Sequence, residues 1–229
     1  NFKIFKNINF LLKILNHEKP DVFFSWMFHS CLIATLASIM NNIKLIWCIR
    51  HGSIVFRKTK ILTIIIAKYI LPTLSSIPSK IVYNSNFSKK YYEKLGYKKN
   101  KTQVIYNGYY KNSFKPNKIF KAAFIEKYKI KRNQIIFGYV ARFSPQKNHY
   151  FLFDCLKSLK KKSNLSFKLI LVGGNIKNNN NLSKLINQFD LKKETIIFRE
   201  TNKINLIYPI FDLNFLVSSY GESFPNTLA

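Results

Sequence analysis

Short, continuous apolar segments alternate along the chain with longer segments in which apolar residues recur every three or four positions. In the first half, this pattern predicts strands at 22–26, 44–49, 80–83 and 102–106, and helices at 2–15, 29–40, 61–71 and 87–95. Continuous apolar strands separated by helices are typical of a parallel sheet with helices on both faces. The first half therefore predicts an α/β domain.

A polar, lysine-rich stretch at 109–133 interrupts the alternation and contains one weak helix around 122–128. The alternation then resumes, with strands predicted at 135–140, 168–172, 195–198 and 213–217, and helices starting at Ser144-Pro145, at 182 and at 206. Periodicity alone allows two α/β domains or one large one. We expect two, at 1–112 and 113–229, each a doubly wound, Rossmann-like parallel sheet.

The composition narrows the choice of partners. The formal charge is +28, yet the lysines are spread over the whole chain, and a bias toward Asn, Lys, Ile, Phe and Tyr explains much of the charge. Because no nucleic-acid-binding module is recognisable, we expect no specific nucleic-acid partner and only a weak attraction to anionic membranes. The three cysteines are scattered, which is typical of reduced thiols in the cytoplasm.

The longest apolar stretch, at 61–74, is broken by Lys68 and Pro72 and is too short to span a bilayer. Its basic helix at 61–71 could instead rest on a membrane surface. No Asp-x-Asp pair or histidine cluster suggests a metal site, so we expect no metal cofactor.

An anion site is predicted where the strand at 135–140 ends. The strand is followed by Arg142, and five residues later Lys147 stands at the expected start of a helix. Fixed cations beside free backbone N–H groups stabilise a departing diphosphate. The alternative is that both residues are ordinary solvated cations.

Two further strand ends carry candidate binding residues. Gly173-Gly174 allows either a close backbone approach to a ligand or an ordinary turn. After the last predicted strand, Glu222 stands between small residues, where its carboxylate could bind sugar hydroxyls or only cap a helix.

These segments resemble the retaining glycosyltransferases of group 1, glycosyltransferase family four. The stretch from Arg142 to Asn148 is similar to the family motif G-R-L-x-x-x-K-N, although Ala141 replaces a usual glycine. Gly173-Gly174 is similar to L-V-G-x-G. The run from Glu222 to Asn226 is similar to the start of E-G-F-P-N-x-x-x-E, whose second glutamate would follow Ala229.

The resemblance implies a GT-B fold, in which two such domains face a cleft. It implies that Arg142 and Lys147 bind the donor diphosphate and that Glu222 contacts the donor sugar as a catalytic residue. Further donor contacts are implied for Gly173, Gly174, Ser223, Phe224, Pro225 and Asn226.

The first half carries weaker resemblances. Ile49-Arg50-His51-Gly52 is similar to the I-R-H-S form of the family's acceptor-domain histidine, which implies a catalytic role for His51. A lone histidine is otherwise usually structural. The stretch Ser25 to Ser30 is similar to S-W-M-Y-H-A-N, so His29 is either an acceptor-side residue or the start of a helix. Tyr83-Asn84-Ser85 matches a Y-N-S landmark.

The resemblance implies transfer of a sugar, with retention of configuration, from a nucleotide-diphosphate donor. The implied acceptor is a lipid-linked saccharide or growing polysaccharide in cell-surface polysaccharide or lipopolysaccharide biosynthesis, met at the inner face of the cytoplasmic membrane. We expect the chain to be a fragment that lacks both ends and is inactive alone. The alternative is a noncatalytic module that binds a nucleotide sugar or a polyanion.

Overall fold

The computed structural model of the chain describes residues 2–199 and 201–229. It separates into two compact units. The first unit extends to Asn107 and also includes Tyr220–Phe224, and the second contains Gly108–Ser219 and Pro225–Ala229. The division therefore falls five residues before the expected boundary at 112, and a short segment late in the chain groups with the first unit.

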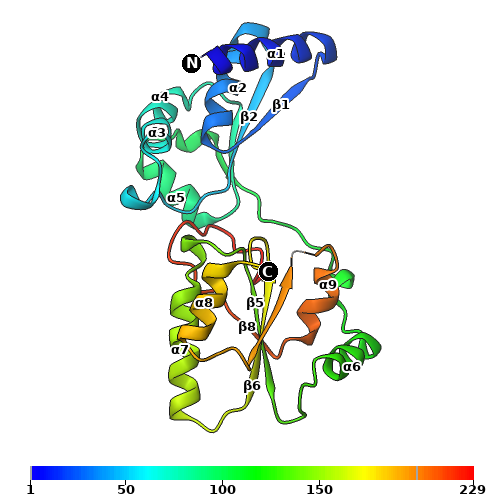
Figure 1. Cartoon of the computed structure of the whole chain (residues 1–229). Helices are drawn as coiled ribbons and strands as arrows, with labels where there is room; N and C mark the ends of the chain where they lie inside the picture. Colours follow the sequence, from blue (N-terminus) through cyan, green and yellow to red (C-terminus); the bar gives the residue numbers. More distant parts are fainter. Residues whose placement is uncertain (1, 200) are drawn as a thin grey trace. The chain divides into compact units, whose positions relative to one another are not determined.

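The first unit is built from alternating helices and strands (Figure 1). Its main elements, in chain order, are α1 (Phe2–Glu18), β1 (Val22–Trp26), α2 (Phe28–Asn41), β2 (Lys44–Ile49), α3 (Ile61–Ile65), a π-helical segment (Ile66–Ile70), α4 (Leu71–Leu74), β3 (Lys80–Tyr83), α5 (Asn86–Lys94) and β4 (Thr102–Val104).

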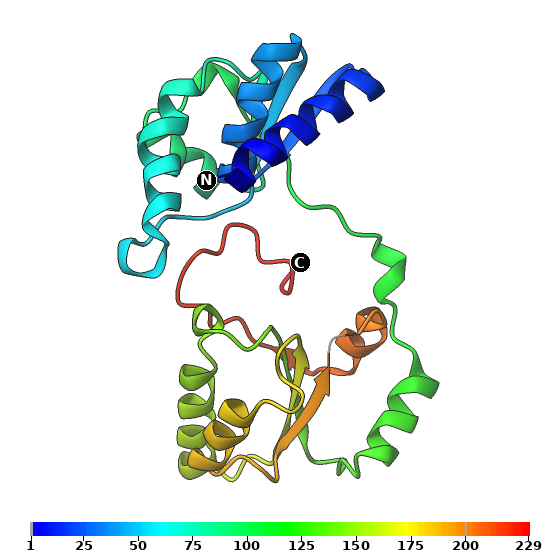
Figure 2. The same ribbon diagram turned by 45° about the horizontal axis from the view of Figure 1, so that its top comes forward.

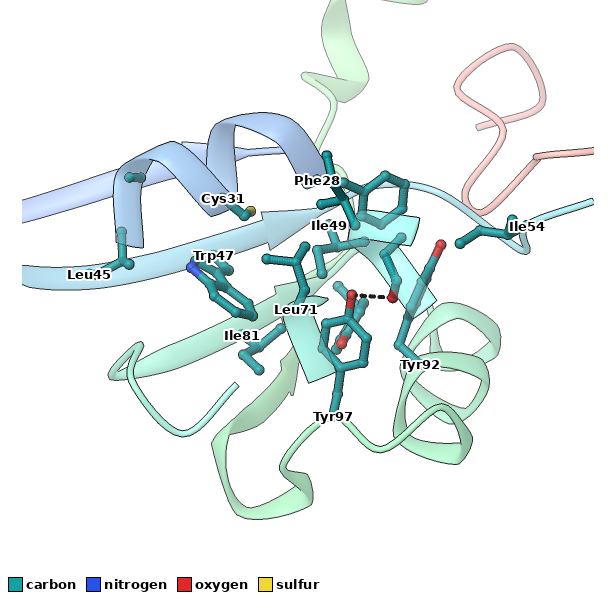
Figure 3. Packing of buried hydrophobic residues seen from close by; sticks show 14 of the residues in the cluster. Phe28, Cys31, Leu45, Trp47, Ile49, Ile54, Leu71, Ile81, Tyr92 and Tyr97 are labelled. Carbon is teal, nitrogen blue, oxygen red and sulfur yellow. Dashed lines mark hydrogen bonds between the residues drawn. The ribbon is translucent and has the colours of Figure 1, made fainter. Parts of the chain in front are cut away.

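The four strands of the first unit form one parallel sheet in the order β1-β2-β3-β4. Alternate residues of β2 point into the core, where Trp47 and Ile49 are fully buried against α2 and the helical segment 61–74 (Figure 3). Tyrosines complete this core: Tyr83 and Tyr92 stack with ring centroids 5.6 Å apart, and the Tyr97 hydroxyl donates to the Ala67 carbonyl at 2.9 Å.

The second unit repeats the alternation. Its main elements, in chain order, are α6 (Lys118–Lys127), β5 (Ile135–Val140), α7 (His149–Lys162), β6 (Phe167–Gly173), α8 (Asn180–Gln188), β7 (Thr195–Arg199), α9 (Ile204–Ile207) and β8 (Leu213–Asn214).

The second sheet is also parallel, in the order β7-β6-β5-β8. In Figure 1, α7 and α8 lie on one face of this sheet, and α6 and α9 lie on the other. Successive residues of β5 divide between the faces: Phe137 and Tyr139 pack on the α7–α8 side, while Ile136 packs on the α6–α9 side. The expected α/β class, with two Rossmann-like parallel sheets, is confirmed.

The central strands β2, β3 and β5 match their predicted bounds, whereas the edge strands β4 and β8 are shorter than predicted. The predicted strand 102–106 ends at Val104, and the predicted strand 213–217 ends at Asn214. Both β4 and β8 pair on one side only, as do β1 and β7, which are not shorter than predicted.

The predicted helix 61–71 is longer than expected and is not uniform. Pro72 has no N–H group and so cannot complete an α-helical bond to the carbonyl of Lys68. The chain accommodates the proline with π geometry over Ile66–Ile70, where the Leu71 N–H bonds to the Ile66 carbonyl. Helix continues to Leu74. Within the described residues, no helix is long and apolar enough to cross a membrane.

Gly138, in the middle of β5, allows a test of how closely the core of the second unit is packed. A Cβ added there would overlap the ring of Phe211, which leads into β8. We expect Gly138→Ala to lower the free energy of unfolding by about 1–3 kcal/mol, the usual cost of an overpacked core. Urea denaturation measures the change. Gly108→Ala is the matched control, because a Cβ at Gly108 meets no atom within 4 Å. Equal effects of the two substitutions would contradict the packing argument.

Candidate functional site

In the second unit, the loops that follow β5, β6 and β8 are joined by backbone hydrogen bonds at the carboxyl edge of the sheet. The Phe143 N–H donates to the Gly174 carbonyl at 3.0 Å, which joins the first two loops. The Ser219 N–H donates to the Gln146 carbonyl at 2.9 Å, which adds the segment after β8. The carboxyl edge is where open α/β sheets bind ligands.

Arg142 and Lys147 both belong to the loop after β5. Arg142 is exposed, and its guanidinium donates to Gln146 Oε1 at 3.3 Å. Lys147 ends a 3₁₀ turn rather than starting the long helix as predicted. Asn148, in the left-handed conformation, separates the turn from α7 and caps that helix by accepting from the Phe151 N–H at 3.4 Å. Lys147 therefore precedes the α7 N-terminus by two residues.

Close packing of the backbone explains why residue 173 is a glycine. It is the last residue of β6, and a Cβ there would overlap the backbone carbonyl of Ala141. The absence of a side chain thus lets the ends of β5 and β6 approach each other. This explains the first glycine of the Gly173-Gly174 pair, while its expected contact with a donor stays a prediction.

His149, the first residue of α7, is a buried polar residue that the sequence did not single out. It is 3% exposed, it packs against the rings of Tyr139, Phe143 and Phe153, and neither ring nitrogen has a hydrogen-bond partner. Burial, with a smaller effect of the Lys147 charge, lowers the pKa of His149 to about 4. The imidazole is therefore neutral at pH 7, next to the cationic loop.

In the first unit, His51 follows β2 at the carboxyl edge of the sheet. Its Nδ1 lies 3.3 Å from the Tyr92 hydroxyl, and its ring meets Phe28 edge to face at 5.7 Å. The Ser88 hydroxyl donates to its carbonyl at 2.9 Å. Burial lowers the pKa of His51 below its ordinary value of 6.5, so the imidazole is neutral at pH 7.

The segment that carries Glu222 lies directly against the residue after His51. The Gly52 N–H donates to the Gly221 carbonyl at 3.3 Å, and a Cβ on Gly52 would overlap the Glu222 carbonyl. Only glycine permits this approach of the two backbones. The structure therefore brings the backbones at His51 and Glu222, two residues predicted to be catalytic, into one neighbourhood.

Ser223 fixes the same segment with its side chain. Its hydroxyl donates to Asn84 Oδ1 at 2.5 Å and also contacts the hydroxyls of Ser85 and Ser88, the former at 2.9 Å. Ser85 meanwhile caps α5 by accepting from the Ser88 N–H at 3.1 Å. In the segment Tyr83-Asn84-Ser85, the side chains of Asn84 and Ser85 therefore hold the Ser223 hydroxyl in place.

The remaining residues of the motif divide between the two units. Phe224 packs on Tyr106 in the first unit, with ring centroids 5.9 Å apart. In the second unit, the Tyr109 hydroxyl donates to Asn226 Oδ1 at 2.6 Å. The Ala229 N–H bonds to the Pro225 carbonyl at 3.3 Å, which makes one helical turn at the predicted helix start.

His29, the predicted acceptor-side residue, lies exposed in the first turn of α2. Neighbouring Met27 has a left-handed φ of 68°, which is rare for a residue with a side chain. Across the described residues, His, Cys, Asp and Glu side chains form no group of three that could hold a metal ion.

A substitution at Gly52 tests the contact with the Glu222 segment. Gly52→Ala should displace residues 220–224, because the new Cβ would occupy the position of a backbone carbonyl. We expect chymotrypsin to cleave after Tyr220 roughly tenfold faster, as local unfolding becomes easier. Gly108→Ala again serves as the control. Unchanged cleavage of the Gly52 variant would show that the contact does not hold the segment.

The buried His149 predicts a specific acid sensitivity. Below pH 6.5 the unfolded chain protonates this residue, whereas the folded chain does so only near pH 4. The contribution of the neutral imidazole to the free energy of unfolding is therefore fully present above pH 6.5. It is lost as the pH falls toward 4. The free energy of unfolding is measured with urea at pH 7 and at pH 4.5. Between these two pH values, the His149→Phe variant should lose roughly 2 kcal/mol less of this free energy than the wild type does. The control His17→Asn, at an exposed position, should keep the wild-type loss; an equal loss in His149→Phe would refute the argument.

Two family models cover almost the whole chain. The model described as Glycosyltransferase Family 4 matches residues 2–110, and the model described as Glycosyl transferases group 1 matches residues 120–229. An uncharacterized glycosyltransferase of Methanocaldococcus jannaschii, MJ1059, is 26% identical over 239 residues, which cover 99% of this chain and 57% of that protein. The chain thus spans little more than half the length of this relative.

Solved structures show the same fold at low identity. Anabaena Alr3699/HepE, in complex with UDP and glucose, has a TM-score of 0.79 at 18% identity, covering 95% of this chain and 57% of that one. The lipopolysaccharide outer core galactosyltransferase WaaB has a TM-score of 0.64 at 17% identity, covering 99% and 58%. The two halves of the chain thus match two glycosyltransferase family models, and the solved structures show that the chain has the GT-B fold.

Proposed function

We propose that the protein transfers a sugar from a nucleotide-diphosphate donor to a saccharide acceptor with retention of configuration. The observation that carries the proposal is the contact of Gly52 with Gly221 and Glu222, which holds the predicted catalytic residues His51 and Glu222 in one part of the first unit. A loop tied this closely to a strand end suits a site that must be preorganised.

Donor binding is assigned to the second unit. Arg142 and Lys147 lie in the loop after β5, where fixed positive charge would stabilise the diphosphate as the bond to the sugar breaks. Gly174, joined to this loop through the Phe143 N–H, completes the same edge of the sheet. The proposal uses no metal ion, because these two cations supply the charge.

His51 and Glu222 receive different roles. With Nδ1 next to the Tyr92 hydroxyl, Nε2 is the His51 nitrogen that we assign to the transferring sugar. A neutral imidazole can donate a hydrogen bond to a sugar hydroxyl without adding positive charge beside a developing oxocarbenium ion. The Glu222 carboxylate would accept hydrogen bonds from other hydroxyls of the same sugar.

The choice of substrates rests on the relatives. HepE binds UDP and glucose, so uridine diphosphate sugars are the first donors to test. WaaB is a lipopolysaccharide galactosyltransferase, which favours a lipid-linked saccharide or surface polysaccharide as acceptor. We place the reaction in the cytoplasm, at the inner face of the membrane, where such acceptors are extended.

The diphosphate assignment predicts large effects at two positions. In the full-length natural protein, Arg142→Ala and Lys147→Ala should each reduce kcat by about 10²-fold or more, because each removes a charge that is needed most in the transition state. Radiolabelled sugar transfer measures the rates. Arg132→Ala and Lys161→Ala remove the same side chains from other exposed positions and should have little effect. A change confined to acceptor KM would contradict the assignment.

The reaction itself is tested with the same protein and a panel of UDP-sugars. Turnover, with NMR of the product showing the anomeric configuration of the donor, is the expected result. Inversion would refute the retaining mechanism. Binding of a UDP-sugar without turnover, in the presence of membrane extracts as acceptor, would instead favour the noncatalytic binding module.

A further inference from the structure

Tyr139, the next-to-last residue of β5, carries a polar group that packing alone does not require. Its side chain is 1% exposed and belongs to the core on the α7–α8 side of the second sheet. Phe137, two residues earlier in the strand, packs in the same core with a phenyl ring. A phenylalanine at position 139 would bury the same ring without removing a hydroxyl from water. The reason for a tyrosine therefore lies in the hydrogen bond that its hydroxyl makes.

The Tyr139 hydroxyl donates to the backbone carbonyl of Lys147. Lys147 ends the 3₁₀ turn Pro145–Lys147, and the left-handed Asn148 follows it. Figure 2 shows this turn between the end of β5 and the start of α7. The hydrogen bonds of a 3₁₀ turn have poorer geometry than those of an α-helix, so the turn alone holds its residues weakly. The buried hydroxyl adds a bond that ties the backbone of Lys147 to β5.

The ring of Tyr139 is itself held in place by His149. The two ring centroids are 4.9 Å apart, with the ring planes at 73°. His149 also meets Phe143 edge to face at 5.1 Å, and Phe143 follows Arg142 directly. One aromatic cluster therefore supports the loop beside both cations that we assign to the donor diphosphate.

We propose that Tyr139 is a positioning residue for the transfer reaction: its hydroxyl fixes the backbone of Lys147, so that the ammonium group is in place before the diphosphate leaves. Charge that is preorganised stabilises a transition state better than charge that must first be ordered. Tyr139 is buried and acts only through Lys147. The inference rests on the proposed function, because it needs Lys147 to bind the donor.

Hydrogen–deuterium exchange of the full-length natural protein tests the positioning without any need for catalysis. The N–H groups of Lys147 and Asn148 bond to the carbonyls of Ser144 and Pro145 within the turn. In the Tyr139→Phe variant, these two amides should exchange roughly tenfold faster than in the wild type, because the turn loses its bond to β5 and opens more easily.

Tyr97→Phe is the matched control. Tyr97 is 2% exposed, and its hydroxyl donates to the backbone carbonyl of Ala67 in the first unit. Both variants therefore remove one buried hydroxyl from one backbone carbonyl, and they should lower the thermal midpoint of unfolding by similar amounts. Only Tyr139→Phe should speed exchange at Lys147 and Asn148. Wild-type exchange at these amides in Tyr139→Phe, or equally fast exchange in both variants, would overturn the proposal.

Rates of sugar transfer test the role of Tyr139 in the reaction. Tyr139→Phe should lower kcat roughly tenfold at a nearly constant KM for the donor, the pattern of a group needed mainly in the transition state. Tyr97→Phe should keep kcat within about twofold of the wild type. In the Lys147→Ala background, Tyr139→Phe should have almost no further effect on kcat, because the ammonium group that it positions is absent. An equal tenfold loss in both backgrounds would contradict an action through Lys147.

Exchange and kinetics together separate the inference from the function on which it rests. A wild type that transfers no sugar from any nucleotide donor would refute the proposed function, whereas the exchange at Lys147 still decides whether Tyr139 holds the turn. Faster exchange with an unchanged kcat in Tyr139→Phe would overturn the inference and leave the proposed function intact.

Discussion

The contact between Gly52 and the backbone of Gly221 and Glu222 is the constraint on which the candidate site depends. It is possible only because Gly52 has no side chain, and the Ser223 hydroxyl reinforces it through Asn84 and Ser85. Residues more than 160 positions apart in the chain thereby occupy one neighbourhood. A hydrogen-bonded backbone and a buried cluster of hydroxyls hold that geometry more rigidly than an exposed loop could.

The bounds of two central strands could be predicted from the sequence, whereas the edge strands β4 and β8 and the contacts of Ser223 could not. Strands 44–49 and 135–140 have the predicted bounds because burial on both faces requires a continuous apolar run. The edge strands β4 and β8 carried no comparable signal. Nothing in the local sequence indicates that Ser85 and Ser88 meet Ser223, since each hydroxyl is equally compatible with an exposed helix start.

The candidate residues differ in how far the sequence could place them. Arg142 and Gly173 follow or end adjacent buried strands, so the parallel topology alone brings them to one edge. The sequence predicted Lys147 at the start of the helix, whereas it lies two residues before α7, because the left-handed Asn148 that delays α7 has no distinctive pattern. His149 was missed altogether: a histidine at a helix start is usually exposed, and only the aromatic cluster around it shows that it is buried.

Charge is divided within this strongly basic chain in a way that suits the proposed transfer of a sugar. Two of the four histidines, His51 and His149, are kept neutral by burial. The positive charge beside the second sheet is instead carried by Arg142 and Lys147, in the loop after β5. A donor diphosphate needs permanent cations, whereas a sugar that develops positive charge needs a neutral hydrogen-bond donor and a carboxylate. Burial of the histidines therefore allows a protein of charge +28 to offer both environments.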